Sequence, residues 1–463
     1  MELVNPVNAR EILPVWINLP VLERECAKGD FVPLIVTSTK PDFYKQAPLF
    51  PAFEKRGLPS VALHTGQHFD SLLGHGLDEF GIRERIGIDL RVRGGLSEKT
   101  SEVVTKLSQV SKFLSEKFPG KTFLPIVHGD THAAGIVPLG WMFATNQKCA
   151  QNEAGLRSMQ PSFKNVKNHG KFFSGQLNEK SWSLNRTEPF PEQFDTFIGG
   201  AACHYHFAPV SLNKESLVRE GYLGENIPVV GNSVVEAFRL AGKKRPEKSV
   251  FADYPVLEKG EWIRVDIHRR ENLLPGRFLA IIGAVKRLVK DGRNVIFIEM
   301  NANKFAIDRL GLSGEIEKLK EEGNFLYTGL WREYGSVVEF LKSGNCRAEL
   351  TDSGSMQEEL NELKKPLSIT CRFSTDRPET VFSAGTNIIA PPISADYLHS
   401  FVSWILSGER ADRLVSKGRR LYGKTPSRKI ADFLYRRRKD PVFEWAHDRP
   451  GVKYKENALG YFL

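Results

Sequence analysis

The chain has 463 residues, of which 41% are hydrophobic and 26% charged, and its formal net charge is +10. This length predicts two or three domains with ample cores, and the composition excludes a disordered or fibrous protein. The positive net charge suits an anionic ligand. The sequence has no zinc-ligand spacing, and it has no nucleic-acid motif, so we expect no nucleic-acid partner.

The cysteines and the apolar segments favour a cytoplasmic location. The five cysteines lie far apart without a CxxC pair, and their odd number argues against a disulfide framework. The N-terminus lacks a basic leader, and Pro14 and Pro20 interrupt its apolar run, which is not typical of a signal peptide. No run approaches the ~20 apolar residues that a membrane helix needs, so we expect no membrane partner.

Short apolar runs alternate with helical segments, which predicts an α/β protein with mostly parallel strands. In the first half the expected strands are 31–36, 60–64, 124–127, one that ends before 152, 205–209 and 227–233. In the second half they are 262–267, 294–299, 345–350, 367–371 and 385–389. Polar residues follow these strands repeatedly, at the sheet edge where ligands bind in open parallel sheets.

Two segments depart from this alternation. Residues 158–190 are rich in Lys, Asn, Ser and Phe with little periodicity. A connection of this length in a compact domain is a lid, a partner surface or a disordered insert. Beyond about residue 405 the chain is helical and basic, and we interpret its run 436–439 as a solvated face in preference to a nucleic-acid or membrane site.

The stretch Ser353-Gly354-Ser355 is the expected tight turn between a strand and a helix. Such a turn offers free backbone N–H groups and the positive end of a helix, which suit a phosphate. Gly354 permits close approach, and the serine hydroxyls add donors. Glu359 lies one turn into the helix, where its carboxylate can accept two hydrogen bonds from a ribose diol. The alternative interpretation is an ordinary helix cap with Asp352 or Ser353 as N-cap.

Charged residues at the other strand ends form two complementary sets. Taken singly, each lysine or carboxylate is more often a surface or capping residue, but their shared placement after strands favours a functional interpretation. Cations and a helix start on one side, with carboxylates nearby, fit a nucleotide-sugar. No GxGxxG or GxxxxGK[ST] motif and no metal cluster is present, which argues against a dinucleotide or a P-loop nucleotide. The first set is Lys40, Lys45, Asp130, Glu153 and Glu192, and the second is His268, Arg269, Ser353, Gly354, Ser355, Glu359 and Arg372.

A series of motifs occurs in a specific order along residues 31–430, and together they resemble the UDP-N-acetylglucosamine 2-epimerase family. Each motif alone is weak, whereas the ordered set is highly specific. The motifs are Thr65-Gly66-Gln67-His68, Gly129-Asp130-Thr131, Glu153-Ala154-Gly155-Leu156-Arg157, Pro191-Glu192, Phe207-Ala208-Pro209, Gly231-Asn232, His268-Arg269-Arg270-Glu271-Asn272, Thr351-Asp352-Ser353-Gly354 with Gln357-Glu358-Glu359, and Asp376-Arg377-Pro378-Glu379 with Gly385-Thr386.

The resemblance implies a GT-B fold, in which two Rossmann-like domains face each other and C-terminal helices cross back to the first. On this basis we expect an N-terminal extension over 1–30, a first domain over 31–235, a UDP-binding domain over 236–425, and a C-terminal helix and tail over 426–463. It further implies a homodimer that serves polysaccharide biosynthesis.

The resemblance also implies an isomerase that interconverts UDP-GlcNAc and UDP-ManNAc without a metal or nicotinamide cofactor. Elimination of UDP would make loss of the C2 proton feasible, and UDP would add back after protonation from the other face. Such a route needs carboxylates as base and acid, and cations that hold the departing UDP. The catalytic residues it implies are Asp130, Glu153, Glu192 and His268. The UDP-binding residues it implies are Lys40, Lys45, Arg269, Ser353, Gly354, Ser355, Glu359 and Arg372.

Three alternatives stay open from the sequence. A hydrolysing relative would share the elimination but let water add, which releases ManNAc and UDP. A GT-B glycosyltransferase would need an acceptor site. A non-enzymatic sensor would keep the UDP-sugar pocket, with 158–190 and the basic tail as docking surfaces.

Overall fold

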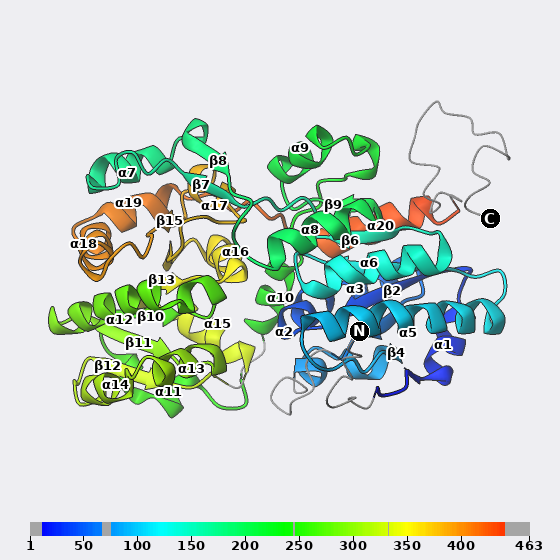
Figure 1. The fold of residues 1–463 in the computed structure, drawn as a ribbon, viewed down its shortest axis with the longest axis horizontal. Coiled ribbons are helices and arrows are strands. Elements are labelled where there is room, and N and C mark those ends of the chain that lie inside the picture. Colours follow the sequence, from blue (N-terminus) through cyan, green and yellow to red (C-terminus); the bar gives the residue numbers. More distant parts are fainter. Residues whose placement is uncertain (1–11, 67–75, 244–245, 332, 440–463) are drawn as a thin grey trace, which may run out of the picture.

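A computed structural model describes residues 12–66, 76–243, 246–331 and 333–439, with only the backbone of Lys40 and Pro41. It contains two α/β domains that lie side by side (Figure 1). The α/β class with mostly parallel sheets, expected from the sequence, is confirmed. No helix in these ranges is both long enough and apolar enough to span a bilayer.

The first domain is built on a seven-stranded sheet in the order β1-β4-β3-β2-β5-β6-β9. All neighbours are parallel except β1, which runs antiparallel to β4. Without β1 the order is that of a Rossmann fold, so ligands are expected at the carboxyl edge of the strands. The strands are β1 Trp16–Ile17, β2 Phe31–Thr37, β3 Val61–His64, β4 Ile86–Asp89, β5 Thr122–His128, β6 Cys149–Asn152 and β9 Cys203–Phe207.

Helices cover both faces of this sheet, because its central strands are apolar and buried throughout. One core lies under α5 and α6, and a second lies under α3 and the C-terminal helix α20. The helices are α1 Leu19–Cys26, α2 Lys40–Gln46, α3 Leu49–Arg56, α5 Leu96–Lys117, α6 His132–Thr145, α8 Glu192–Ala201 and α9 Ser211–Arg219.

The second domain repeats the design with a fully parallel six-stranded sheet in the order β12-β11-β10-β13-β14-β15. Its strands are β10 Trp262–Asp266, β11 Asn294–Ile298, β12 Phe325–Thr328, β13 Cys346–Thr351, β14 Leu367–Thr370 and β15 Asn387–Ile389. Its helices are α10 Val234–Ala241, α11 Val250–Asp253, α12 Pro275–Lys290, α13 Asn301–Arg309, α14 Ser313–Lys320, α15 Tyr334–Lys342, α16 Gly354–Leu363, α17 Glu379–Phe382, α18 Ala395–Leu406 and α19 Arg410–Lys417.

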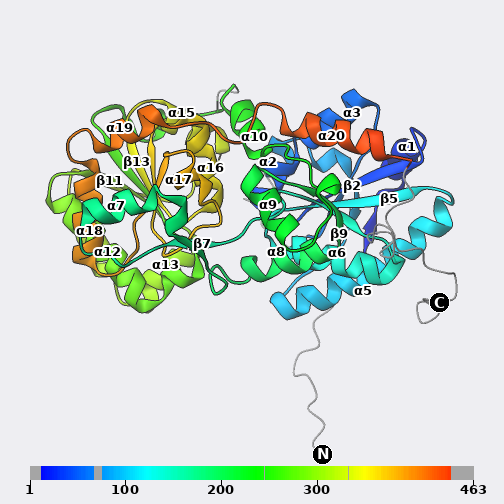
Figure 2. The same ribbon diagram turned by 90° about the horizontal axis from the view of Figure 1, so that it is seen from above.

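The chain returns to the first domain through α20 Pro426–Arg437, which packs on α3 (Figures 1 and 2). This is the crossing expected of the C-terminal helices. The predicted boundary at 235/236 falls within α10, and the predicted tail beyond residue 439 lies outside the described residues.

Residues 158–190, which we call the strap, fold on the second domain although both flanking segments belong to the first. Strands β7 Met159–Pro161 and β8 Trp182–Leu184 pair antiparallel and enclose helix α7 His169–Gln176. The strap lies beside β15 and α18 (Figure 1). Of the three interpretations left open, the disordered insert is wrong, because aromatic side chains of the strap join the core of the second domain.

Two further expectations differ from the structure. The segment expected as an extension before the first strand includes β1 and α1, and Val21 and Leu22 of α1 are buried in the first core. The strand expected at 227–233 is reduced to one parallel bridge between Ala208 and Val229. Pro228 removes a ladder donor beside that bridge, which limits the strand.

Candidate active site

Three acidic residues of the first domain project from the carboxyl edge of its sheet. Asp130 follows β5, Glu153 follows β6, and Glu192 is the first residue of α8. Glu153 has a positive φ of 58°, unusual for a residue other than glycine. A Cβ at Gly129 would lie 2.6 Å from Oε2 of Glu153, so glycine is needed there for the carboxylate to fit. The backbone conformation at Glu153 and the glycine at position 129 therefore both accommodate the Glu153 side chain.

Glu153 is fully buried and surrounded by hydrogen-bond donors from both domains. Lys45 Nζ lies 3.1 Å from both carboxylate oxygens, and Arg377 Nη2 donates to Oε1 at 2.8 Å. His128 Nε2 lies 3.0 Å from Oε2, and Asn232 Nδ2 donates to Oε1 at 2.9 Å. Burial by itself would raise the pKa of Glu153, but Lys45, Arg377 and His128 hold that pKa well below its ordinary value. Glu153 is therefore a fixed anion.

A second buried carboxyl, Glu358 of α16, meets the same groups but has the opposite pKa shift. Asn232 Nδ2 donates to its Oε1 at 2.7 Å, and Lys45 Nζ lies 3.5 Å from its Oε2. Burial and the adjacent charge of Glu153 raise the pKa of Glu358 to about 8. The two glutamates thus differ in charge at neutral pH, because one set of cations neutralises only one of them.

Asp130 lies at the more accessible margin of this cluster. Its side chain is 15% exposed, and Oδ2 is 3.5 Å from Nη1 of Arg377. Burial raises the pKa of Asp130, and Arg377 partly opposes that shift. The charge of Arg377 also reaches Asp376, 3.2 Å away. A partly accessible carboxyl with a raised pKa is suited to give and take a proton near neutrality.

Glu192 and His268 are the other accessible members of the predicted catalytic set. Glu192 is 27% exposed and accepts a hydrogen bond from Arg269 of the second domain. His268 is 35% exposed, and its Nδ1 lies 3.1 Å from Asp266 and 3.3 Å from Asp352. Burial would lower the pKa of His268, but Asp352 and Asp266 raise it. The two carboxylates of the second domain therefore favour the protonated form of this imidazole.

The predicted turn between a strand and a helix is confirmed: β13 ends at Thr351, and α16 begins at Gly354 with Ser353 as N-cap, as the cap interpretation also expected, so phosphate binding at this turn stays a prediction. The Ser353 hydroxyl accepts from the Met356 N–H at 3.4 Å, so the helix cap and the free N–H groups of the first turn occur together. Arg377 covers this turn closely, since a Cβ at Gly354 would lie 2.6 Å from its Nη1. Because residue 354 is a glycine, the Arg377 guanidinium can lie directly against the first turn of α16.

Unsatisfied polar atoms lie beside this turn. Among the described residues, Nε and Nη2 of buried Arg372 have no hydrogen-bond partner. Nε of Arg269 has none either. Glu359 leaves Oε2 unpartnered, and burial raises the pKa of Glu359 to about 7 while a hydrogen bond from Tyr334 opposes that rise. Buried donors and acceptors without partners are rare and fit a polar ligand.

The structure thus brings together most of the residues predicted from the sequence, in two groups. Lys45 forms ion pairs with Glu153 and Glu358, and Arg269 forms one with Glu192. The Lys40 side chain lies outside the described part of the structure, although Lys40 opens α2 as expected. The roles assigned to these residues stay predictions.

Four residues of the cluster were absent from the predicted set, namely His128, Asn232, Glu358 and Arg377. All four lie within or beside motifs singled out in the sequence, which was the available signal. Their partners are distant in the chain: Arg377 is 224 residues from Glu153, and Asn232 is 126 residues from Glu358.

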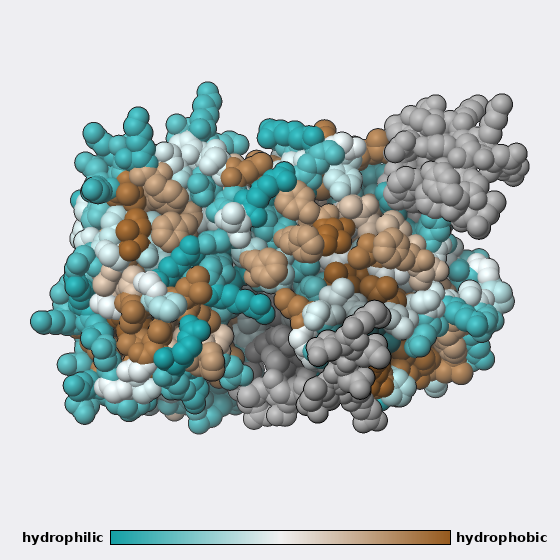
Figure 3. Space-filling view, in the orientation of Figure 1, coloured by the Kyte–Doolittle hydropathy of each residue, from teal (hydrophilic) through white to brown (hydrophobic). Residues whose placement is uncertain are grey.

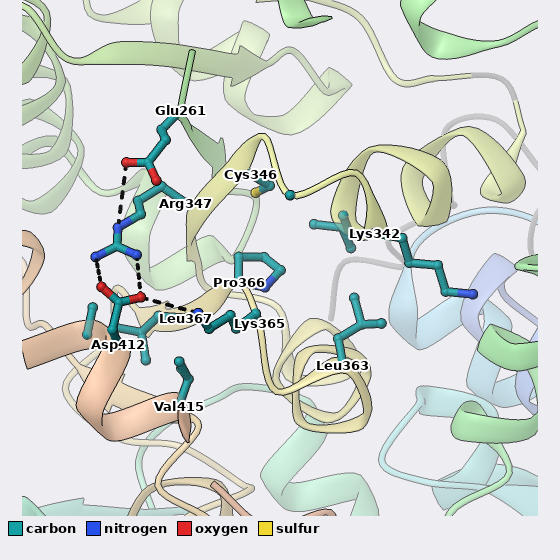
Figure 4. Close-up of a pocket in the computed structure, with 13 residues that line it drawn as sticks. Glu261, Lys342, Cys346, Arg347, Leu363, Lys365, Pro366, Leu367, Asp412 and Val415 are labelled. Carbon is teal, nitrogen blue, oxygen red and sulfur yellow. Dashed lines mark hydrogen bonds and ion pairs between the residues drawn. The ribbon is translucent and has the colours of Figure 1, made fainter. Parts of the chain in front are cut away.

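A charged pocket of about 560 Å³ lies at the opposite, amino edge of the second sheet, where β13 and β14 begin (Figure 4). Its central guanidinium, Arg347, makes two hydrogen bonds to Asp412 at 2.7 and 2.8 Å. Lys365 reaches the same carboxylate at 3.4 Å. Arg347 also lies 3.9 Å from Glu261, so its charge is balanced by two carboxylates within this pocket.

Fold and site together define a two-domain, Rossmann-like protein of the GT-B type with an interdomain site. A family model described as UDP-N-acetylglucosamine 2-epimerase matches residues 182–435. The chain belongs to this family, as its ordered motifs indicated.

Curated relatives named UDP-N-acetylglucosamine 2-epimerase match most of the chain. That of Salmonella borreze is 28% identical over 416 residues, covering 87% of this chain and 97% of the relative. That of Methanocaldococcus jannaschii is 28% identical, covering 77% and 87%.

Solved structures confirm the fold. The UDP-GlcNAc 2-epimerase of Neisseria meningitidis bound to UDP-GlcNAc aligns with a TM-score of 0.69 and 24% identity, covering 88% of this chain and 100% of that chain. The Methanocaldococcus jannaschii enzyme in complex with UDP-GlcNAc and UDP aligns with a TM-score of 0.68 and 24% identity, covering 88% and 99%.

Proposed function

We propose that the protein is a non-hydrolysing UDP-GlcNAc 2-epimerase that interconverts UDP-GlcNAc and UDP-ManNAc. The observation that carries this proposal is the pairing of first-domain carboxylates with second-domain guanidinium groups. Arg377 beside the start of α16 contacts Asp130 and Glu153, and Arg269 contacts Glu192. Carboxylates on one side suit proton transfer at the sugar, and unpaired cationic donors on the other suit a diphosphate. The activity named for the curated relatives supports the same substrate.

In the proposed reaction a carboxylate removes the proton from C2 while the bond between C1 and the UDP oxygen breaks. This step gives 2-acetamidoglucal and UDP. Protonation of C2 from the opposite face and re-addition of UDP at C1 then complete the inversion. Asp130 and Glu192 are partly exposed, so we assign the proton transfers at C2 to them.

Other residues hold charge during the reaction. Glu153, buried and ionised, fixes Lys45 and Arg377 beside the reacting sugar. Arg269, Arg372 and the N–H groups after Ser353 stabilise the departing UDP, with His268 adjacent, and Glu359 accepts from the ribose. Lys40 and Lys45 complete the set proposed for UDP.

Proton NMR of the purified protein with UDP-GlcNAc in deuterated water tests this proposal. We expect UDP-ManNAc with deuterium at C2. A product without deuterium would exclude the elimination route. Free ManNAc with UDP as the sole products would contradict the non-hydrolysing assignment and favour the hydrolysing alternative, in which water adds to the glucal.

We also propose a homodimer. Figure 3 shows apolar residues over α6 and α8, and the exposed apolar side chains of these helices include Phe143 of α6, 70% exposed, and Phe194 of α8, 59% exposed. Contiguous apolar surface of this kind marks protein interfaces. Light scattering should give twice the mass of one chain, and a monomer would contradict the proposal. The cytoplasmic location stays a prediction.

A further inference from the structure

The strap connects the two loops that carry proposed catalytic carboxylates. It leaves the first domain directly after the Glu153 loop and returns to that domain at Glu192. At its start, the Ser158 N–H donates to Gln193 Oε1 of α8 at 2.7 Å. Both ends are thus fixed to the first domain beside the site, while the segment between them is folded on the second domain.

The middle of the strap is anchored in the second domain. Phe172 and Trp182 are 1% and 8% exposed and belong to the core around β14, β15 and α18. The side-chain amide of Gln176 makes the two hydrogen bonds that a neighbouring strand would make to Ile389. Its Nε2 donates to Ile389 O at 2.9 Å, and its Oε1 accepts from Ile389 N at 2.7 Å. This covers the exposed edge of β15, so the anchor combines apolar burial with paired backbone groups.

Where the strap crosses between domains, it pairs with the loop that supplies Arg377. Met159 and Thr375 exchange two backbone hydrogen bonds of 2.9 Å, and Ser158 Oγ lies 3.1 Å from Ser374 Oγ. Two residues beyond Thr375, Arg377 binds both Glu153 and Asp130. Movement of the second domain away from the carboxylates must therefore detach the strap from that domain or bend the chain where the strap joins the first domain, at Ser158 and Glu192.

At its other end the strap forms an ion pair with the second domain. Glu188 accepts two hydrogen bonds from Arg277 of α12, at 2.6 and 3.1 Å, and both side chains are mostly buried. Four residues later, Glu192 binds Arg269. The strap thus holds the domains together on both sides of the carboxylate cluster.

We propose that the strap determines the fate of the intermediate, because its anchors keep the domains closed on UDP and the glucal until UDP has added back. This inference rests on the proposed function. With the domains closed, the C1–O bond re-forms to the UDP oxygen. When they open early, water supplies the oxygen at C1 and a proton to C2, and free sugar and UDP leave. Gln176, Glu188 and Arg277 are positioning residues in this scheme.

Three variants test the strap. Gln176→Leu keeps the side-chain size and removes both bonds to Ile389, and Glu188→Arg turns the ion pair into a repulsion. Glu188→Arg with Arg277→Glu exchanges the two charges and restores the pair. Lys180→Ala is the matched control, because Lys180 is an exposed residue of the same strap.

Two measurements are made on each variant: the fraction of turnovers that end in free sugar, by NMR with UDP-GlcNAc, and the rate of UDP release, by stopped flow. We expect both to rise about 3- to 10-fold in Gln176→Leu and Glu188→Arg, the scale of one or two lost hydrogen bonds. The charge exchange should return both towards the wild-type values, and Lys180→Ala should leave them unchanged.

The two proposals fail in different ways. A wild-type protein that makes no UDP-ManNAc overturns the proposed epimerase, whatever the variants do. UDP release from Gln176→Leu and Glu188→Arg at the wild-type rate overturns the strap inference, whether or not the wild-type protein epimerises. Faster UDP release with an unchanged product ratio also overturns it, because closure would then not decide the fate of the glucal.

Discussion

The two edges of the second domain's sheet carry similar charged residues but use them differently. At the amino edge, Arg347 and Lys365 both bind Asp412 within one pocket, and Arg347 also lies 3.9 Å from Glu261. At the carboxyl edge, Arg269 and Arg372 keep donors without partners, next to a helix start. Carboxylates of the first domain also face the carboxyl edge. Charge alone therefore does not mark a site; unsatisfied donors opposite a complementary surface do.

The largest expected effect is loss of turnover at the carboxyl edge. Asp130→Asn should lower kcat by about 10²- to 10⁴-fold, because it removes a group that transfers a proton at C2. UDP affinity, measured by calorimetry, should stay near the wild-type value, since the proposal places Asp130 at the sugar and not at UDP. Normal turnover in this variant would remove Asp130 from the mechanism.

Glu153→Gln should destabilise the protein by about 3–5 kcal/mol, because it removes the anion closest to the buried Lys45 and Arg377. Urea unfolding measures the loss. The matched control is Glu192→Gln, the same change at a partly exposed carboxylate, which should cost roughly 1 kcal/mol or less. Equal small losses in both variants would show that Glu153 does not anchor the cluster.

Glu359→Ala should weaken UDP binding by about 1–3 kcal/mol, the scale of a lost buried hydrogen-bond pair. Calorimetric titration with UDP measures it. If the affinity is unchanged, Glu359 does not contact the ribose, and its raised pKa reflects burial alone.

Glu358 predicts a pH dependence of stability. Its folded pKa is raised from 4.5 to about 8, so the stability it contributes is fully present below 4.5 and is lost as pH rises through 8. In Glu358→Gln, the fall in unfolding free energy between these pH values should be shallower, by up to about 1.4 kcal/mol per pH unit. Denaturant titrations at several pH values measure this slope. A slope equal to that of the wild type would mean that Glu358 is ionised in the folded protein.

The smallest effect is expected at the amino edge. Asp412 is 40% exposed, so Asp412→Asn should change stability by about 1 kcal/mol or less and leave UDP affinity and turnover unaltered. A loss of UDP affinity would mean that the two edges are not functionally distinct.

Local sequence predicted most elements near the site, because each depends on neighbouring residues. The apolar run that forms β2 and the Ser353-Gly354 turn of α16 were both recognisable. The strand expected at 227–233 is limited to one bridge with Ala208, because Pro228 cannot donate a hydrogen bond to a neighbouring strand. The segment 158–190 had little periodicity to interpret, since its few buried side chains, among them Phe172 and Trp182, pack on a domain whose strands follow later in the chain.

By itself, the sequence determined the α/β class, the family and the order of the motifs, since these follow from local patterns of residue type. Tertiary structure alone decided which charges meet. Lys45 and Glu153 are 108 residues apart, and Gln176 and Ile389 are 213 apart. Contacts at such separations depend on how two sheets and a strap are placed in space. The same placement lowers the pKa of Glu153 and raises that of Glu358, although both are buried glutamates.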